Sequence, residues 1–368
     1  MKDMKSRRIL LATAICSLMG GLSAQPIPTE GSKPTTRVER TIDVKEAGTM
    51  VEQLTEDEAN QITHLTLTGE LNAIDFRHLR DEFLRLEELD LTDVRIKAYS
   101  GKKGTCTNEI YVYLPHAIPE RAFATKTGDS TYVGKESLRR IILPKKVKFI
   151  REAAFSGCNN LEICQIDRSS PPALYRGAMS DTVTAIFVPQ GSLDAYRMKE
   201  KWEGFAFLEG EPVMATVQIS RASSLADELA AQGLQPGAVH YLTVEGKLDA
   251  NDFLLIRDYM PLLVSVNLEK CNATSIPDFT FTQKKYLLRM KLPRGLKTIG
   301  QRAFSGCGRL SGTLVLPAGV TAIEMGAFMG CEKLSRVLVT GRELTTVGEN
   351  LFGGAKGVLV YGDGNTPQ

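Results

Sequence analysis

A cysteine follows a Phe-x-Gly triplet at three places in this chain of 368 residues. The letters AFSGC occur at residues 154–158 and again at 303–307, and the near copy AFMGC occurs at 327–331. A recurring cysteine could be a nucleophile, which needs a base beside it, or a metal ligand, which needs further ligands at close spacing. It could equally fill one buried position of a repeating coil, because a free thiol packs as a small hydrophobe.

The other side chains that could do chemistry form no site pattern. The four histidines make no HExxH motif, and none stands at metal-ligand spacing from another His or Cys. The pairs Asp75/Asp81 and Asp252/Asp258 recur at matched positions, which favours helix capping over two acids that face each other across a cleft. No Walker motif or GxGxxG motif occurs. We therefore predict no catalytic residue, no metal site and no cofactor.

The first residues form an export signal. Four basic residues lie within 1–8, an apolar run covers 9–22, and small residues precede Gln25. This run is too short to span a bilayer. We predict a signal peptide over 1–24 and a linker over 25–40. Cys16 leaves lipid anchoring as an alternative, although Ile15 stands where a lipobox has a small residue.

Removal of this segment takes four basic residues and one acidic residue, so the formal net charge changes from +2 to −1. A nearly neutral chain offers no overall electrostatic attraction for nucleic acid or for an anionic membrane. Six cysteines remain, and export would permit disulfides between them. The spacing predicts buried thiols, with a bond between Cys307 and Cys331 left open.

Apolar pairs at positions i and i+2 recur through the second half in steps of 24, 24, 24, 23 and 21 residues. The pairs are Leu242/Val244, Val266/Leu268, Met290/Leu292, Leu314/Leu316, Val337/Val339 and Val358/Val360. Two further rows keep a period of 24, namely Ile299, Ile323 and Val347, and Phe304, Phe328 and Phe352. Each pair indicates a short half-buried strand. A period in the twenties with one strand per repeat is typical of a leucine-rich-repeat solenoid.

The first half repeats this design. The row there is Leu65/Leu67, Leu89/Leu91, Ile141/Leu143, Ile163 and Ile186. Residues 63–83 align with 240–260 at an offset of 177, and later segments align at offsets of 158 and 149, so the first half carries insertions near 97–115 and 124–136. Short helices are expected at the start of each half and over 75–86 and 252–260, with Asp75 and Asp252 as N-caps.

We predict a leucine-rich-repeat solenoid, an α/β repeat with one short strand per coil of about 23–24 residues and otherwise mostly loop and short helices. Two tandem homologous repeat units cover 41–211 and 212–368, as one curved solenoid or two jointed ones. Each coil leaves an apolar face open, so stability comes from contacts between neighbouring coils.

The segments AFSGCNNLE, LKTIGQRAFSGC and FVPQGSLDAYRMKEKWEGF resemble the Bacteroides surface protein A type of leucine-rich-repeat protein. The resemblance extends over the chain from about Val38 onward. It implies an exported or surface-displayed protein of Bacteroidetes-like bacteria that acts in adhesion and host contact, and it implies no reaction. The segment that closes the first half is missing from the second half, which ends at YGDGNTPQ.

Two surfaces are candidates for binding. The insertions hold Tyr and Lys side chains of the kind that contact protein or glycan partners, and insertions in solenoids map to loops on one face. These residues are Tyr99, Lys102, Lys103, Tyr111, Tyr113 and Tyr132. A structural bulge without a ligand is the alternative.

The second surface is the concave strand face, since the middle residue of each strand pair points away from the core. The main candidates on this face are Thr66, Asp90, Ile142, Thr243, Asn267 and Lys291. The same rule places Cys164, Phe187, Val315 and Leu338 on this face.

These observations predict an exported, cell-surface or secreted binding protein that mediates adhesion or contact with proteins or glycans, without catalysis. Its partner would be a protein or glycan on a host or bacterial surface and no nucleic acid, and no transmembrane segment would remain after signal cleavage. A periplasmic location, a structural cell-envelope component without a specific ligand, and a glycan-active enzyme on a solenoid scaffold are the alternatives.

Overall fold

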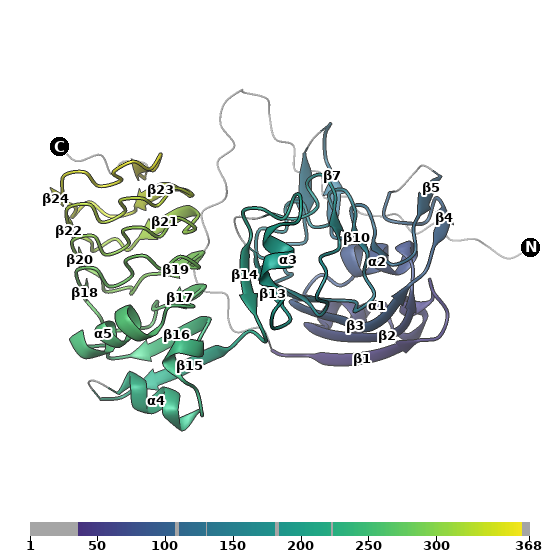
Figure 1. The fold of residues 1–368 in the computed structure, drawn as a ribbon, viewed down its shortest axis with the longest axis horizontal. Helices are drawn as coiled ribbons and strands as arrows, with labels where there is room; N and C mark the ends of the chain where they lie inside the picture. Colours follow the sequence, from purple (N-terminus) through teal and green to yellow (C-terminus); the bar gives the residue numbers. More distant parts are fainter. Residues whose placement is uncertain (1–35, 107–109, 130, 181–183, 222–223, 363–368) are drawn as a thin grey trace, which may run out of the picture. The chain divides into compact units, whose positions relative to one another are not determined.

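The computed structural model describes residues 36–106, 110–129, 131–180, 184–221 and 224–362 (Figure 1). Residues Arg37–Gln368 group into one compact unit. The predicted signal peptide over 1–24 and most of the predicted linker lie outside the described residues. Within the described part of the chain, no helix combines the length and apolarity needed to cross a bilayer.

Short parallel strands build a first repeat array that runs from β1 to β14, with one main strand for each coil and a second, shorter strand in several coils. Its main sheet has seven strands in the order β1-β2-β3-β9-β11-β13-β14, and a smaller parallel sheet has the order β12-β10-β6. The main strands are β1 (Glu39–Val44), β2 (His64–Leu71), β3 (Glu88–Ile96), β9 (Arg140–Leu143), β11 (Ile163–Ile166), β13 (Ala185–Val188) and β14 (Ala206–Glu209). The smaller ones are β6 (Ala117–Ile118), β10 (Phe149–Ile150) and β12 (Ala173–Leu174).

A second repeat array runs from β15 to β25, and its strands follow one another as successive rungs in Figure 1. Its main strands are β15 (Met214–Ile219), β16 (Tyr241–Gly246), β17 (Ser265–Asn267), β19 (Arg289–Lys291), β21 (Gly312–Leu316), β23 (Leu334–Val339) and β25 (Val358–Tyr361). A parallel row of short strands contains β18 (Ser275–Ile276), β20 (Thr298–Ile299), β22 (Ala322–Ile323) and β24 (Thr346–Val347). Leu242 pairs with Val266 and Val266 with Met290, as the 24-residue row predicts. The leucine-rich-repeat solenoid is therefore confirmed.

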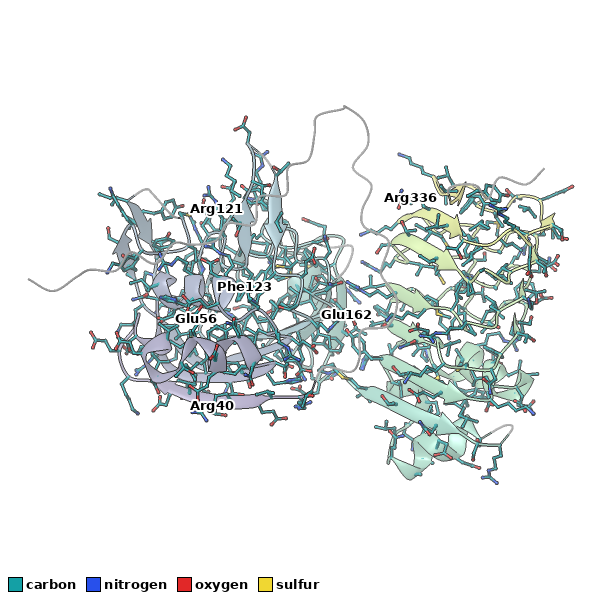
Figure 2. The ribbon with its side chains drawn as sticks, turned by 180° about the vertical axis from the view of Figure 1, so that it is seen from behind. Arg40, Glu56, Arg121, Phe123, Glu162 and Arg336 are labelled. Atoms are coloured by element: carbon teal, nitrogen blue, oxygen red, sulfur yellow. The ribbon has the colours of Figure 1, made fainter. Side chains whose placement is uncertain are left out.

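Phenylalanine rings form a continuous row inside the second array. The rings of Phe281 and Phe304, of Phe304 and Phe328, and of Phe328 and Phe352 stack with centroids 5.2, 5.5 and 5.9 Å apart. In the first array Phe123 lies in the interior in the same manner (Figure 2). Aliphatic side chains fill the rest of each core, and burial of this apolar surface is the main stabilising term of the fold.

The cysteine of each Phe-x-Gly-Cys motif is a buried thiol that ties its coil to the coil before it. Each thiol donates to the main-chain oxygen of the preceding phenylalanine: Cys158 to Phe123 (3.4 Å), Cys307 to Phe281 (2.9 Å) and Cys331 to Phe304 (3.1 Å). Every cysteine in the described segments is free and buried. Burial raises the pKa of the Cys158 and Cys331 thiols to about 12, so both stay protonated at neutral pH. The motif therefore marks a repeat and supplies no nucleophile.

Each array opens with short helices. Their bounds are η1 (Met50–Gln53), α1 (Glu56–Gln61), α2 (Ala73–Asp81), α4 (Leu225–Ala231), η2 (Pro236–Ala238) and α5 (Ala250–Tyr259), and α3 (Leu193–Arg197) precedes β14. The prediction of Asp75 and Asp252 as N-caps is wrong by three residues, because the N-caps are Asn72 and Asp249. Asp75 and Asp252 stand at the third helical position, where their carboxylates accept the main-chain N–H of the N-cap at 2.8 and 3.1 Å. These are capping boxes, in which side chains satisfy the open N–H groups of a helix start.

The register of β11 differs by one residue from the predicted row. Cys164, and not Ile163, pairs with Ile141 and Ile186 and lies in the core. The expectation that Cys164 points outward is therefore wrong. All four side chains of β11 are buried, so the alternation that reveals the inner face of a strand is absent from its sequence.

The last strand, β25, shows the same kind of shift. Leu359, and not Val358, pairs with Val337 and packs against the core. Val358 points outward and is 51% exposed. The sequence VLVY is apolar at every position, so its pattern could not decide between the two faces.

Candidate interaction surfaces

The two insertions of the first array are antiparallel hairpins rather than irregular loops. In the first, β4 (Tyr99–Gly101) pairs with β5 (Tyr111–Tyr113). In the second, β7 (Ala124–Lys126) pairs with β8 (Tyr132–Gly134). In Figure 1 both hairpins project from the coils that carry the parallel sheets. The hairpin pairing gives each insertion a defined backbone on which side chains alternate between two faces.

Tyrosines of the first hairpin hold it against the solenoid. Tyr113 is 4% exposed, and its hydroxyl accepts the main-chain N–H of Cys106 at 2.7 Å. The Tyr111 hydroxyl donates to the Glu120 carboxylate, and burial together with this hydrogen bond raises the pKa of Tyr111 to about 12. The ring of Tyr99 stacks on that of Tyr113 with centroids 5.9 Å apart. These rings therefore pack the base of the hairpin, and Tyr113 has almost no surface to offer to a ligand.

The solvent-facing side of the hairpins consists of other residues. Lys102 and Lys103 are exposed at the turn of the first hairpin, as a binding role requires. Val112 alternates with the two inward tyrosines of β5 and is 67% exposed. Tyr132 in the second hairpin is half-buried beside the exposed Val133. Sequence reasoning missed these valines because it searched the insertions for Tyr and Lys alone.

The predicted residues of the strand face form two rows in register. One row contains Thr66, Asp90 and Ile142 on β2, β3 and β9. The other contains Thr243, Asn267 and Lys291 on β16, β17 and β19. All six side chains are half-buried or exposed. Neighbouring strands of a sheet lie about 4.8 Å apart, so each row presents a ladder of side chains at fixed spacing.

Charges beside the first row are paired within the face. Glu88 lies between His64 and Arg140, with N–O distances of 3.4 and 3.7 Å. Asp90 accepts the main-chain N–H of Thr92 at 2.8 Å. The open part of this face therefore carries polar groups in fixed orientations without a strong excess of either charge, as suits contact with a protein surface.

The strands β11, β13 and β14 of the first main sheet are covered on their outer face by the second array. Phe187 and Leu208, which continue the outer row on β13 and β14, pack in one apolar cluster with Tyr241 and Val264. The Tyr241 hydroxyl also donates to the main-chain oxygen of Glu162 at 3.3 Å. Phe187, predicted to lie on the binding face, is therefore not available to a ligand. This cover also explains why β11 and β13 are buried on both faces.

His240 lies beside this apolar cluster. Its ring packs edge-on against the ring of Phe187 at 5.1 Å between centroids, and its Nδ1 accepts the main-chain N–H of Val213 at 3.0 Å. Burial lowers the pKa of His240 to about 4, so the ring is neutral at pH 7. Among the described residues no acidic side chain forms an ion pair with this ring. The ring packs against Phe187 and accepts one main-chain hydrogen bond.

Two matching buried lysines cap helices. Lys284 Nζ donates to three main-chain oxygens at the end of α5, at 2.7, 2.8 and 3.0 Å. Lys135, at the equivalent place of the first array, donates to the main-chain oxygen of Arg80 in α2 at 3.2 Å. Burial lowers the pKa of each lysine to about 8. Both amines are directed at helix ends and away from solvent, so they complete helix termini rather than form a nucleophilic site.

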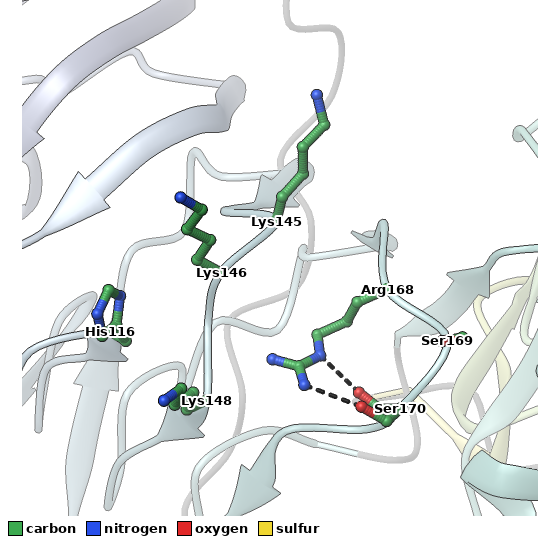
Figure 3. Close-up of a pocket in the computed structure, with 7 residues that line it drawn as sticks. All are labelled: His116, Lys145, Lys146, Lys148, Arg168, Ser169 and Ser170. Atoms are coloured by element: carbon green, nitrogen blue, oxygen red, sulfur yellow. Dashed lines mark hydrogen bonds between the residues drawn. The ribbon is translucent and has the colours of Figure 1, made fainter.

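An open hollow of about 520 Å³ on the first array carries mainly basic side chains (Figure 3). Lys145, Lys146 and Lys148 come from the turn between β9 and β10, and Arg168 comes from the turn between β11 and β12. This hollow was not predicted from the sequence. The run KKVK at 145–148 was the available signal, but Arg168 lies 20 residues beyond it and only the stacking of coils brings the two turns together.

Within the described ranges, no three His, Cys, Asp or Glu side chains gather in a way that could hold a metal ion. The paired acids singled out in the sequence have structural partners: Asp81 contacts Arg80 at 2.7 Å and Asp258 contacts Arg257 at 2.8 Å.

Comparison with known proteins gives one family match. Residues 118–182 and 259–358 match the model described as "BspA type Leucine rich repeat region", in six copies. No curated protein sequence matches the chain.

Several solved structures of leucine-rich-repeat proteins align with this chain. A leucine-rich repeat protein from Bacteroides ovatus is 16% identical over 83% of this chain and 85% of that chain, with a TM-score of 0.29. One from Eubacterium ventriosum is 15% identical over 83% and 80%, with a TM-score of 0.27. A leucine rich cell surface protein from Faecalibacterium prausnitzii is 14% identical over 82% and 79%, with a TM-score of 0.24. At these scores the likeness carries no argument about function.

Proposed function

We propose that this chain, in which residues 118–182 and 259–358 match BspA-type leucine-rich repeats, is an exported, surface-associated binding protein. It mediates adhesion or another contact with proteins or glycans of a host or a neighbouring bacterium, and it catalyses no reaction. The observation that carries the proposal is the open ladder of Thr66, Asp90 and Ile142, held in register by three paired strands.

A rigid ladder suits recognition for a physical reason. Side chains on paired strands lose little further freedom when a partner binds, so the entropy cost of association is low. The exposed tips of the two hairpins could add contacts beside the ladder, through Lys102, Lys103 and the exposed valines. Affinity would then come from many modest contacts over a large preformed area.

Binding is tested with the purified chain on a panel of extracellular-matrix proteins and on a glycan array. A variant with Thr66→Arg and Ile142→Arg places two long cationic side chains on the ladder, and we expect it to weaken binding at least tenfold. Met198→Arg, at a position 83% exposed at the C-cap of α3, is the matched control and should bind as the wild type does. Undiminished binding by the ladder variant would show that the partner binds outside the ladder.

Location is tested by protease treatment of intact cells that express the full chain. Degradation of the protein while a periplasmic marker survives supports surface display. Protection of the protein in intact cells, followed by degradation after the outer membrane is opened, would place it in the periplasm and refute the surface assignment. Surface display without any partner on either panel would favour a structural envelope component.

A further inference from the structure

The basic hollow of the first array differs from the equivalent turn of the second array. At the offset of 149, Lys146 corresponds to Gly295 and Lys148 to Lys297. Lys297 pairs with Glu343 at 3.3 Å. Neither Lys146 nor Lys148 has an ion pair with any acidic side chain that the structure describes. The first array therefore holds uncompensated positive charge where the second array neutralises it.

The turn that faces these lysines is fixed by its own hydrogen bonds. Arg168 donates through Nε to the main-chain oxygen of Ser170 at 2.6 Å and through Nη2 to the Ser170 hydroxyl at 2.9 Å (Figure 3). Its Nη1 donates to the main-chain oxygen of Val147, which lies between the two lysines. The guanidinium thus joins the two turns and adds a third positive charge to the hollow. Lys145, the fourth cation, is paired with Asp93 at 3.1 Å.

Two aromatic rings follow the two turns of the hollow in the chain, Phe149 in β10 and Tyr175 just after β12, and both lie outside the residues that line it. Phe149 follows Lys148 and is half-buried, and its ring meets the ring of Tyr175 edge-on at 6.4 Å between centroids. The guanidinium of Arg151 lies 4.0 Å from the centre of the Tyr175 ring. Rings of this kind pack against the apolar faces of sugar rings, while nearby cations attract acidic substituents on the same sugars.

We propose that this hollow binds an acidic polysaccharide that carries sulfate groups, and that the same extended chain reaches the rings of Phe149 and Tyr175, which follow the two turns. A single small anion would gain little here, because Lys146 and Lys148 are exposed to water on flexible stems. A polyanion contacts several cations at once and releases its own counterions, so the same lysines become effective. Nucleic acid is bound by more extended basic surfaces than the cations that line this hollow.

The inference names a ligand class for the proposed binding function and rests on that function, but the two can fail separately. Binding of a polysaccharide is measured on purified protein, whereas surface display is measured on cells. A periplasmic protein could still bind the polysaccharide, and a surface protein could still fail to bind it.

The test measures binding of heparin, used as a sulfated probe, by biolayer interferometry at low and at physiological salt. A variant with Lys146→Gln and Lys148→Gln should bind at least tenfold more weakly at low salt and depend less steeply on salt concentration. The matched control, Lys285→Gln with Lys297→Gln, makes the same charge change at exposed lysines of the second array and should bind as the wild type does. Circular dichroism verifies that both variants are folded.

Further outcomes decide the ligand class. Chemically desulfated heparin should bind more weakly than heparin, and Phe149→Ser should weaken binding of heparin severalfold without a change in the salt dependence. The proposal is overturned if heparin does not bind at low salt, or if the double lysine variant binds it unchanged. It is also overturned if a single-stranded oligonucleotide or anionic phospholipid vesicles bind the hollow as tightly as heparin does.

Discussion

Truncation of one ring in the phenylalanine row tests how the solenoid is held together. Phe304 is fully buried and stacks on two rings, Phe281 at 5.2 Å and Phe328 at 5.5 Å. Replacement of a buried phenylalanine by alanine costs about 3–5 kcal/mol through lost transfer energy and the cavity left behind. Two stacked neighbours place Phe304→Ala at the upper part of this range, near 4–5 kcal/mol.

Phe352 provides the matched comparison at the end of the row. It is half-buried and stacks on Phe328 alone, at 5.9 Å. The same substitution there removes less buried surface and one ring contact, so we expect a loss of about 1–2 kcal/mol. The two variants differ in position within the row and not in chemistry.

Urea unfolding followed by circular dichroism gives the free energy of unfolding of each variant. A second readout is the rate at which a thiol reagent labels Cys307 and Cys331, which are buried in the coils beside Phe304. Local opening exposes these thiols, so Phe304→Ala should accelerate their labelling far more than Phe352→Ala does. Equal losses of stability for the two variants, or a loss below about 1.5 kcal/mol for Phe304→Ala, would refute the argument.

Two further predictions concern buried ionisable groups. Lys284→Met should lower the free energy of unfolding by about 2 kcal/mol at pH 7, because three main-chain oxygens at the C-terminal end of α5 and its C-cap lose their donor while the cost of burying the charge disappears. Lys135→Met removes one such contact and should cost less than half as much in urea unfolding, and equal costs would contradict the capping role. For His240, the folded-state pKa of about 4 lies below the ordinary value of 6.5, so the unfolded chain takes up a proton first as the pH falls. This stability is fully present above pH 6.5 and is lost between pH 6.5 and 4, by up to about 3 kcal/mol. His240→Gln should therefore show a smaller fall in Tm than the wild type over this range, and parallel curves would argue against a buried neutral ring.

Much of the fold could be predicted because its information is local and repeated. The row of Leu242, Val266 and Met290 and the row of Phe304, Phe328 and Phe352 share one period. Each coil therefore buries equivalent apolar side chains against the next coil. A solenoid with contacts between neighbouring coils therefore follows from periodicity alone. The insertions were also visible, as changes in the offset between the two halves.

The candidate binding surfaces were less predictable, because they depend on contacts between distant residues. Tyr113 is of a residue type that often contacts binding partners. In the structure, however, its hydroxyl accepts the main-chain N–H of Cys106 and its ring stacks on that of Tyr99. The basic hollow joins Lys146 to Arg168 across stacked turns, and no spacing rule connects the two.

By itself, the sequence determined the repeat, its strand rows and the buried place of the cysteines in the Phe-x-Gly-Cys motif, because an apolar residue at a constant period has to face the shared core. Only the tertiary structure decided which outer face stays open. On β11 and β13 both faces are buried, since Phe187 and its neighbours pack against Tyr241 from the second array, and a strand buried on both sides carries no alternation from which to choose its register. Apolar and polar side chains alternate along a strand when one of its faces meets the core and the other meets water. A strand that tertiary contacts cover on both faces has no such alternation.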